Sequence, residues 1–510
     1  MSQKPFYITT PIYYVNDVPH IGHAYTTLAC DMAARFARLE GRPVLFVTGT
    51  DEHGLKNAKT AQEKGRTPQE HVDLLSENFR HLCTVSHVSN DDFIRTTQPR
   101  HIKAAQAMWQ ALSDSGHIYL GKYEGWYSTR DEAYYAESEI ADGKAISSGS
   151  PVEWVEEPSY FFKLSAFGDQ LLSFYKAHPN FIQPKSRYNE VVKFVESGLR
   201  DLSISRTTFN WGVPVPGDEA HIMYVWLDAL TNYLTCVGYP NENDSTYKIF
   251  WPEALHVVGK DILRFHAVYW PAFLMAAELP LPRGIYAHGW WTKDGQKISK
   301  SLGNAIDPLQ LYETYGLDQV RYFLMREVTF GQDGDFSHTA MVSRMNGDLA
   351  NDYGNLVHRV LSFLDKQLGG VLPALEPLTA DDVALLNQAQ AMLPHVAALM
   401  KQMALSKVLE EIWSLVGAAN RYIDAQKPWG LKVTDPARMA TILAVLVDVI
   451  RRIALLTQPI MPDASAQILD MLNVKEHHRL FAAYNTHLSS GAQLRKPICV
   501  FKKWEDPDAS

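Results

Sequence analysis

The sequence predicts an α/β protein in which a parallel sheet flanked by helices is interrupted by a smaller inserted domain and followed by an all-α bundle. Three observations predict this. The chain opens as strand, loop and helix; apolar strands later run into glycine; and long amphipathic helices dominate after Asp307-Pro308. The 510 residues, 46% of them hydrophobic, supply apolar side chains for several cores, and roughly 150 residues per domain gives about three domains.

The first elements have the order of a parallel nucleotide-binding sheet. Residues Phe6–Thr10 are β-branched and aromatic, Asn16–Pro19 form a turn, and a helical pattern runs from His20 to Arg38. The segment Pro43–Gly49 is continuously apolar, as in a strand that helices cover on both faces. These features predict a strand, helix, strand beginning.

The middle of the chain differs from its flanks. Residues 116–216 read as short aromatic strands and turns with acidic runs and weak helical periodicity, which predicts an insertion. The α/β pattern resumes at Met223–Trp226 and at Leu255–Gly259. The predicted bundle helices span Asn346–Leu368, Ala380–Lys401, Lys407–Gln426 and Pro436–Leu456.

Charge and cysteine content exclude several classes of protein. A net charge of −9 argues against a nonspecific nucleic-acid coat, which needs a net basic face. The four cysteines form no C-x-x-C pair, which argues against a zinc ribbon and a disulfide scaffold and favours a reducing compartment. The N-terminal residues do not resemble a signal peptide, and no apolar stretch approaches the ~20 residues that span a bilayer, so we expect a cytoplasmic protein without membrane contact.

The segment His20-Ile21-Gly22-His23 places two imidazoles three residues apart at a helix start. Ring N–H donors, unsatisfied backbone donors and the positive end of the helix dipole suit phosphate oxygens, and Gly22 permits close approach. Two surface histidines at a helix cap explain the tetrapeptide equally well. A metal site is less favoured because no third ligand is nearby.

A second motif, Lys297-Ile298-Ser299-Lys300-Ser301, follows a predicted turn at Lys293–Gln296. Two lysines on a mobile loop can close over a polyphosphate and stabilise charge on the leaving group. A solvated basic loop is the simpler explanation for this motif alone. Together the two motifs predict the two halves of a triphosphate site.

These two motifs resemble the HIGH and KMSKS signatures of class I aminoacyl-tRNA synthetases, with a departure at Ile298. Further segments look like methionyl-tRNA synthetases in order and spacing, so the resemblance covers nearly the whole chain. They are Gly49–Gly54, Tyr224–Ala229, Gly259–Ile262, Phe265-His266, Leu349–Asn351 and Asn355–Val357.

The resemblance implies a Rossmann-type catalytic domain with a small connective insertion, followed by a helical-bundle anticodon-binding domain. The expected boundaries are 1–115 and 223–290 for the halves of the catalytic domain, 116–222 for a zinc-free insertion, 291–345 for the KMSKS-loop and stem-contact region, 346–490 for the bundle and 491–510 for a tail. The implied enzyme is a methionine–tRNA ligase that uses L-methionine, ATP with Mg²⁺, and both initiator and elongator tRNA(Met). A monomer is expected because the chain ends soon after the bundle.

The resemblance also implies roles for particular residues. Those expected to be catalytic are His20, His23, Lys297 and Lys300. Those expected to bind ATP are His20, Gly22, His23, Gly259, Asp261, Lys297, Ser299 and Lys300. For Asp261, the residue type alone is explained equally by an N-cap of the following helix.

The implied methionine pocket comprises Ile12, Tyr14, Asp51, Trp226, Ala229, Leu230, Tyr233, Ile262 and His266. Asp51 would hold the α-ammonium, and aromatic ring edges suit a thioether. Composition alone would make these aromatics ordinary core, and the residue types do not separate methionine from leucine.

The insertion has about a hundred residues, too few for a typical editing domain. Where many methionyl enzymes have the first cysteine pair of a zinc knuckle, this chain has Ser128 and Asp131. We therefore expect no structural zinc, with Trp126, Tyr127, Tyr134 and Tyr135 packing the insertion instead.

Periodicity predicts one buried stripe along the first bundle helix, formed by Leu349, Tyr353, Leu356, Val357, Val360 and Leu364. Asn355 and Arg359 project from the other side, where they can read and stack on unpaired bases. The resemblance assigns them, with Trp429, to the CAU anticodon. Without the resemblance, the default explanation is a solvated helix face for Asn355 and Arg359 and an apolar anchor at a helix end for Trp429.

Two rival functions stay open. One is a sister class I synthetase for another apolar or sulfur-containing amino acid. The other is a non-catalytic paralogue that acts as an RNA-binding or assembly module, which retention of both histidines, both lysines and Asp51 disfavours.

Overall fold

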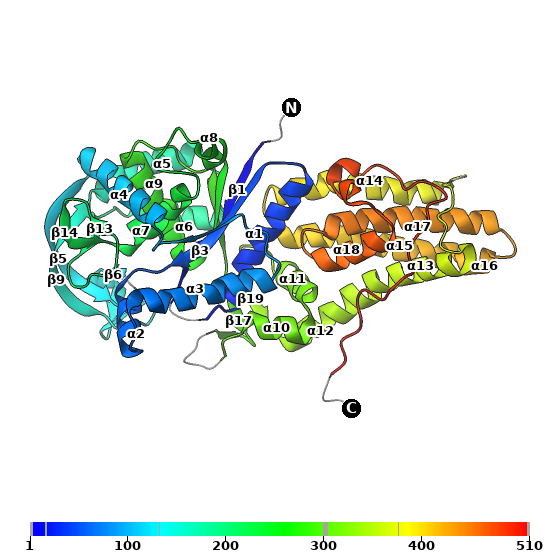
Figure 1. Cartoon of the computed structure of the whole chain (residues 1–510), viewed down its shortest axis with the longest axis horizontal. Helices are drawn as coiled ribbons and strands as arrows, with labels where there is room; N and C mark the ends of the chain where they lie inside the picture. Colours follow the sequence, from blue (N-terminus) through cyan, green and yellow to red (C-terminus); the bar gives the residue numbers. More distant parts are fainter. Residues whose placement is uncertain (1–3, 16–17, 132, 299–303, 376, 507–510) are drawn as a thin grey trace. The chain divides into compact units, whose positions relative to one another are not determined.

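The computed structural model describes residues 4–15, 18–131, 133–298, 304–375 and 377–506. Its contacts divide the chain into two compact units (Figure 1). The sheet unit comprises Pro5–Pro19 and Leu45–His288, and the bundle unit comprises Met1–Lys4, His20–Val44 and Gly289–Ser510. This division cuts across the domain boundaries expected from the sequence, which stay predictions.

The sheet unit is built on a seven-stranded sheet in the order β10-β16-β15-β1-β3-β2, with β4 paired to β3. Each pair whose register is described runs parallel. The strands are β1 (Phe6–Thr9), β2 (Tyr13–Tyr14), β3 (Val44–Asp51), β4 (Asp92–Arg95), β10 (Ile182–Gln183), β15 (Ala254–Gly259) and β16 (Gly284–His288). The predicted apolar strands therefore form a parallel sheet, as expected for strands buried on both faces.

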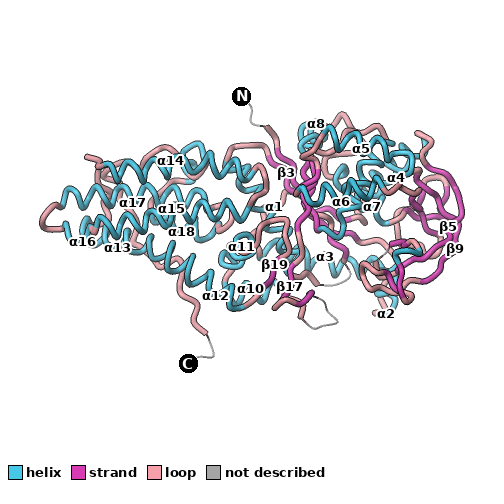
Figure 2. Tube along the Cα trace, turned by 180° about the vertical axis from the view of Figure 1, so that it is seen from behind, coloured by secondary structure: helices cyan, strands magenta, loops and turns pink. Residues whose placement is uncertain are grey.

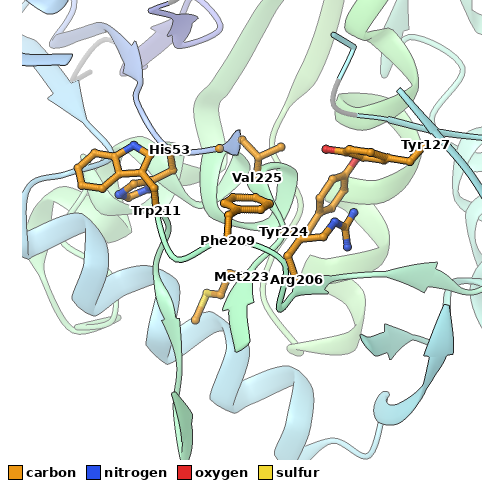
Figure 3. Close-up of a pocket in the computed structure, with 9 residues that line it drawn as sticks. His53, Tyr127, Arg206, Phe209, Trp211, Met223, Tyr224 and Val225 are labelled. Atoms are coloured by element: carbon orange, nitrogen blue, oxygen red, sulfur yellow. The ribbon is translucent and has the colours of Figure 1, made fainter. Parts of the chain in front are cut away.

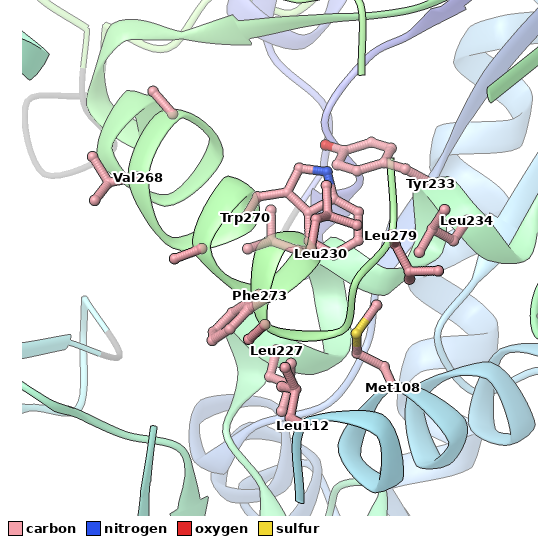
Figure 4. Packing of buried hydrophobic residues seen from close by; sticks show 14 of the residues in the cluster. Met108, Leu112, Leu227, Leu230, Tyr233, Leu234, Val268, Trp270, Phe273 and Leu279 are labelled. Atoms are coloured by element: carbon pink, nitrogen blue, oxygen red, sulfur yellow. The ribbon is translucent and has the colours of Figure 1, made fainter. Parts of the chain in front are cut away.

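Four helices contribute to one large apolar core, α4 (Pro99–Asp114), α7 (Val225–Thr235), α8 (Ser245–Phe250) and α9 (Trp270–Ala276). Helix α3 (Pro68–Val85), which contacts α2 (Leu55–Glu63), packs in a separate small cluster with side chains of β2 and β4. Figure 4 shows α7 side chains such as Leu227 and Leu230 packed between Met108 and Leu112 of α4 and Phe273 of α9. The core thus fixes helix α7, on which four of the predicted methionine contacts lie.

The predicted insertion contains a long antiparallel pair, β5 (Ile118–Ser128) and β9 (Glu153–Phe162), within the order β11-β9-β5-β6. Its other strands are β6 (Ala133–Tyr135), β7 (Ile140–Ala141), β8 (Lys144–Ala145), β11 (Leu202–Ser203), β12 (Ser205–Arg206), β13 (Pro214–Val215) and β14 (Asp218–Met223). Trp126 and Trp154 face each other across β5 and β9, with ring centroids 5.5 Å apart. Among the aromatics expected to pack the insertion, Tyr127 is buried, and the side chain of Tyr134 lies outside the described residues.

The expectation of weak helicity in this region is wrong for two segments, α5 (Gly168–Ala177) and α6 (Lys185–Glu196). Each helix buries only two side chains four residues apart, Leu171 with Tyr175 and Val191 with Val195. So narrow an apolar stripe gives little periodic signal in a sequence. Strand β10 lies between them and pairs with β16 of the main sheet.

The bundle unit contains α1 (Ile21–Leu39), which the sequence predicts, and the predominantly helical C-terminal part of the chain. Its long helices α13 (Asn355–Leu368), α14 (Ala380–Met400), α15 (Leu405–Gln426) and α17 (Pro436–Thr457) run side by side in Figures 1 and 2. Its shorter helices are α10 (Pro308–Tyr315), α11 (Leu317–Arg326), α12 (His338–Arg344), α16 (Pro428–Leu431) and α18 (Pro462–Met471). A small sheet in the order β18-β17-β19 joins Gln296–Lys297, Trp291–Lys293 and Gly334–Phe336.

The first predicted bundle helix is not α-helical throughout. Residues Met345–Gly354 form a π-helix, η7, which continues directly into α13. Two side chains of α15 stabilise its wider turns, since Trp413 Nε1 donates to the Asp348 carbonyl at 3.2 Å and Asn420 Nδ2 donates to the Asp352 carbonyl at 3.0 Å. Such π-turns are frequent at functional sites. In the part of the chain that the structure describes, no helix has the length and apolarity to cross a membrane.

Candidate functional site

The two histidines of the first motif form a cap at the start of α1. The backbone N–H of Gly22 donates to His20 Nδ1 and that of His20 to His23 Nδ1, each at 3.0 Å, and the rings lie 3.9 Å apart. A ring whose Nδ1 accepts presents Nε2–H as a donor. Burial, then the nearby His20 ring, lower the pKa of His23 well below its ordinary value, so a neutral imidazole donates there at pH 7.

Gly22 is sterically required by this arrangement, because a Cβ there would lie 2.9 Å from His20 Cε1. The sequence-based expectation of a compact donor group at a helix start is therefore met in its geometry. Its role toward phosphate stays a prediction. The alternative explanation, two histidines that only cap the helix, predicts the same hydrogen bonds.

The second motif begins on a β-hairpin of the bundle unit. Strands β17 and β18 pair Thr292 with Lys297, and the turn between them contains Asp294 and Gly295, both with positive φ. Asp335 holds this turn by accepting from Thr292 Oγ1 at 2.6 Å and from the Gly295 N–H at 2.8 Å. The predicted turn is thus confirmed. The Lys297 side chain, Ser299 and Lys300 lie outside the described residues.

The end of strand β3 presents Asp51, which is 8% exposed and lies opposite Tyr14 in the register of β2 and β3. The next residue, Glu52, accepts from Arg95 Nε at 2.6 Å and from Thr97 Oγ1 at 2.5 Å. Arg95 also pairs with Asp73. A buried carboxylate so bonded anchors the backbone next to Asp51.

The other predicted methionine contacts gather in the same unit. Trp226, Ala229, Leu230 and Tyr233 lie on α7, Ile262 ends the turn η4 (Lys260–Ile262), and His266 lies in the π-helix η5 (Phe265–Tyr269). Ile12, Trp226 and Ile262 pack against the core that contains Leu230 and Tyr233. The half-buried Trp226 stacks on Phe265, with 3.7 Å between ring centroids, whereas Tyr233 is fully buried core.

Tyr233 and His266 share a hydrogen bond whose direction the surroundings determine. His266 Nδ1 lies 3.0 Å from the carbonyl of Ile262, which only accepts, so Nδ1 carries the proton. His266 Nε2 therefore accepts from the Tyr233 hydroxyl at 2.7 Å. Burial, partly offset by the Ile262 hydrogen bond and by Asp261, lowers the pKa of His266 to about 4, so the ring is neutral at pH 7.

Of the two predicted adenosine contacts, Gly259 is the last residue of β15 and Asp261 lies in the turn η4 that follows, both in the sheet unit. A Cβ on Gly259 would lie 2.4 Å from Asp261 Oδ1, so the glycine allows the carboxylate to fold back over the strand end. The alternative role of Asp261 as an N-cap is wrong. Gly259 occupies the N-cap of η4, and Asp261 lies inside its first turn.

A small cavity between the insertion and α7, with room for about one water, has walls of both polar and aromatic side chains. Figure 3 shows His53 and Trp211 at one end and Arg206 with Tyr127 at the other. Arg206, which no sequence pattern indicated, is 3% exposed and lies 4.7 Å over the Tyr224 ring. It donates to Ser203 Oγ at 3.0 Å, and its Nε lies 3.9 Å from the buried carboxylate of Glu157. No local pattern separates a buried arginine from a surface one, and here the guanidinium compensates the charge of Glu157 inside the insertion.

The position expected to lack zinc contains a network of hydroxyls around one carboxylate. Asp131 accepts from Tyr135 Oη at 2.7 Å, from Ser150 Oγ at 2.6 Å and from Ser148, and Ser128 Oγ accepts from its backbone N–H at 3.3 Å. Within the described residues, no cluster of three histidine, cysteine or acidic side chains is arranged to hold a metal. The zinc-free insertion stays a prediction, with this network as its physical basis.

The predicted RNA-reading residues lie together in the bundle unit. The predicted stripe is confirmed, because its six side chains are all buried, while Asn355 is exposed and Arg359 half-buried. The Arg359 guanidinium lies 5.4 Å over the Trp429 ring and donates to Asp424 at 2.8 Å. Trp429 is 44% exposed, so part of its indole is accessible to a ligand.

Comparisons with known proteins identify the family. A model of class I tRNA synthetases (M) matches residues 6–143 and 137–361, and a model of the anticodon-binding domain of methionyl tRNA ligase matches residues 372–510. The chain is 54% identical over 506 residues to the methionine–tRNA ligase of Rickettsia bellii, covering 98% of this chain and 99% of that one. It is 53% identical to that of Brucella suis, covering 100% and 99%.

Solved structures agree with these matches. The Mycobacterium tuberculosis methionyl-tRNA synthetase in complex with methionyl-adenylate is 48% identical, with a TM-score of 0.96 over 98% of this chain and all of that one. Its apo form is 46% identical, with a TM-score of 0.90 over 99% of each chain. The parallel-sheet catalytic fold and the helical bundle are those of a class I aminoacyl-tRNA synthetase. Within that class, the chain belongs to the methionyl-tRNA synthetase family.

Proposed function

We propose that this chain is a methionine–tRNA ligase. It activates L-methionine with ATP to methionyl-adenylate and pyrophosphate, then transfers the methionyl group to the 3′-terminal ribose of tRNA(Met). The observation that supports this best is full-length identity of 54% to a methionine–tRNA ligase, together with close similarity to a synthetase in complex with methionyl-adenylate.

In the first step, a methionine carboxylate oxygen forms a bond to the α-phosphorus of ATP, and the bond from that phosphorus to the pyrophosphate oxygen breaks. No covalent enzyme intermediate is needed, so the protein positions the reactants and stabilises charge. His20, Gly22 and His23, with Lys297, Ser299 and Lys300, would contact the triphosphate. Gly259 and Asp261 would contact the adenosine. Mg²⁺ would be bound mainly by phosphate oxygens, its usual ligands together with carboxylates.

The amino acid would occupy the side chains gathered at the ends of β2 and β3 and along α7. Asp51 would hold the α-ammonium, and Ile12, Trp226 and Ile262 would contact the side chain, because these three are only partly buried in the core. Fully buried Tyr233 and His266 would shape the base of the pocket through their mutual hydrogen bond.

Recognition of tRNA would use Asn355, Arg359 and Trp429 against the anticodon of both initiator and elongator tRNA(Met). Their cluster supports this role, since an exposed indole under a guanidinium is a stacking platform for an unpaired base. A monomer in the cytoplasm stays the expected state.

Amino-acid-dependent ATP–pyrophosphate exchange tests the proposal. Exchange with methionine, and much weaker exchange with leucine, valine or cysteine, is the expected result. Exchange with one of the other three but not methionine would establish the sister-synthetase alternative. No exchange with any amino acid, despite binding of tRNA(Met), would establish the non-catalytic one.

A further inference from the structure

A carboxylate on helix α7 lies buried between two imidazoles. Asp228 is 1% exposed, its Oδ2 lies 2.6 Å from His53 Nδ1, and its Oδ1 lies 2.7 Å from His101 Nε2. Burial alone would raise the pKa of Asp228, but the charge of His53 and hydrogen bonds from His101 and His53 outweigh it and bring that pKa to about 2. An ionised carboxylate only accepts, so both imidazoles donate to it.

These three residues belong to three separate elements. Asp228 lies on α7 between Trp226 and Ala229, His53 lies two residues after Asp51, and His101 lies in the first turn of α4. His101 Nδ1 also lies 3.1 Å from Thr235 Oγ1 near the other end of α7. One carboxylate therefore connects the helix that contains the aromatic contacts to the segment that contains Asp51.

The remaining contacts of α7 are mainly apolar. Figure 4 shows Leu227, Leu230 and Leu234 in a packed cluster with side chains of α4 and α9. Apolar packing is non-directional. It therefore opposes separation of α7 from its neighbours strongly, but it opposes a small slide or rotation of α7 only weakly. At the start of α7, two charge-assisted hydrogen bonds of fixed geometry define its position along and about its axis, whereas Tyr233 near its end bonds to His266 and to Tyr7 Oη.

The segment around Asp51 is itself anchored independently of α7. Glu52 is bonded to Arg95 and Thr97, its carbonyl accepts from Trp211 Nε1 at 2.7 Å, and the Gly54 N–H donates to the Trp211 carbonyl at 3.1 Å. The bond from His53 to Asp228 thus joins α7 to a segment that is already fixed. A shift of about 1 Å between the ammonium site and the side-chain pocket is enough to impair binding.

We infer that Asp228 is a positioning residue for methionine recognition, which holds Trp226, Ala229 and Tyr233 in register with Asp51 through His53 and His101. This inference rests on the proposed function. Asp228 itself does not contact the substrate. Removal of its carboxylate weakens methionine binding because α7 is displaced.

Asp228→Asn is the primary test, in pyrophosphate exchange by the full chain with methionine and ATP varied separately. The amide keeps the size of the carboxylate but presents an N–H to one imidazole. The KM for methionine rises by about tenfold, whereas the KM for ATP changes by less than about twofold. Tryptophan fluorescence on methionine addition gives the same loss of affinity without ATP.

Asp382→Asn is the matched control. Asp382 is also fully buried, accepts from Tyr422 and Arg438, and lies in the bundle unit outside every residue assigned to binding. Its partners are an arginine and a tyrosine, not two histidines, but its carboxylate is equally buried and hydrogen-bonded, so the control reports the general effect of neutralising such a group. Its melting temperature falls, and both KM values stay at those of the unsubstituted chain.

The outcomes separate cleanly. If Asp228→Asn lowers the melting temperature as Asp382→Asn does but leaves the KM for methionine unchanged, Asp228 is merely structural and the inference is wrong. If Asp228→Asn does not fold, His53→Leu decides, because leucine has no donor for Asp228 and the link from α7 to the Asp51 segment is lost, together with the edge contact of His53 on Trp211. A selective rise in the KM for methionine supports the inference, and unchanged KM values contradict it. Failure of the unsubstituted chain to exchange with methionine would instead contradict the proposed function.

Discussion

Arg321 and Asp31 form a fully buried ion pair in the bundle unit, with 2.5 Å between Nη2 and Oδ2. The same guanidinium donates to the carbonyls of Ile460 at 2.8 Å and Pro459 at 3.1 Å. Helix α11 therefore connects α1, whose N-terminus bears the two cap histidines, to the turn between α17 and α18. Each acceptor of this guanidinium is itself buried, so the interaction depends on all its partners being present.

Replacement of Arg321 by methionine should destabilise the protein by about 3 to 5 kcal/mol, because Asp31 would keep a buried charge with one partner fewer. Arg35, which also pairs with Asp31 at 2.8 Å, lessens the loss. Adding Asp31→Leu should recover part of it, since replacing both members of a buried pair by apolar groups is far less costly than removing one. Urea unfolding measures the free energy of unfolding of the single and the double variant. A double variant less stable than Arg321→Met alone would contradict the prediction.

Protonation of His266 should lower the free energy of unfolding as the pH falls. Its folded pKa of about 4 lies below the ordinary 6.5, so between these values the unfolded chain binds a proton that the folded chain does not. The free energy of unfolding then decreases by about 1.4 kcal/mol per pH unit from this residue as the pH falls through that window. His266→Gln removes the titrating group, so its stability difference from the unsubstituted chain should narrow from pH 7 to pH 4.5. A constant difference in urea unfolding over this range would be inconsistent with a buried neutral imidazole.

Local pattern was enough to predict much of this structure. The stripe from Leu349 to Leu364 follows from one helical period, and the turn before Lys297 follows from Asp294-Gly295, whose backbone conformations few other residues adopt. In both cases the information lies within one or two turns of chain.

What could not be predicted depends on partners far away in the sequence. Asp228 is 175 residues from His53 and 127 from His101, and no local feature of any of them indicates the others. The π-helix η7 relies on donors from α15 more than sixty residues later. Assignment of methionine as the substrate came from resemblance to a family, because the aromatic residue types alone fit a core equally well.

Gly259→Ala should weaken ATP binding selectively. The backbone at Gly259 has a φ of −67°, which any residue adopts, so the effect comes from the added methyl, which would lie 2.4 Å from Asp261 Oδ1. We expect the KM for ATP in pyrophosphate exchange to rise by about tenfold with little change for methionine. Gly168→Ala is the control, because a Cβ there meets no atom within 4 Å. Equal effects on both substrates would show a general distortion of the strand end.

Asp131→Ala should loosen the insertion locally. Tyr135, Ser148 and Ser150 would lose their common acceptor, at a cost of about 1 to 3 kcal/mol for fully buried Ser150 and less for the half-buried Tyr135 and Ser148. Hydrogen exchange should accelerate over residues 128–151 and not in the bundle, and substitution of exposed Glu137 by alanine should leave it unchanged. Elemental analysis should find no stoichiometric zinc, and one tightly bound zinc per chain would refute the hydrogen-bonded alternative to a knuckle.

Trp429→Ala should separate tRNA charging from amino-acid activation. The indole is 44% exposed beneath Arg359, and base stacking on such a ring is worth about 1 to 3 kcal/mol. The kcat/KM for tRNA(Met) should therefore fall by about 10- to 100-fold, while methionine-dependent pyrophosphate exchange stays within about twofold. Trp154→Ala, which removes a 55% exposed indole from β9, is the matched control and should affect charging far less. If Trp429→Ala lowered exchange as much as charging, the ring would support the fold of the enzyme and not the recognition of the anticodon.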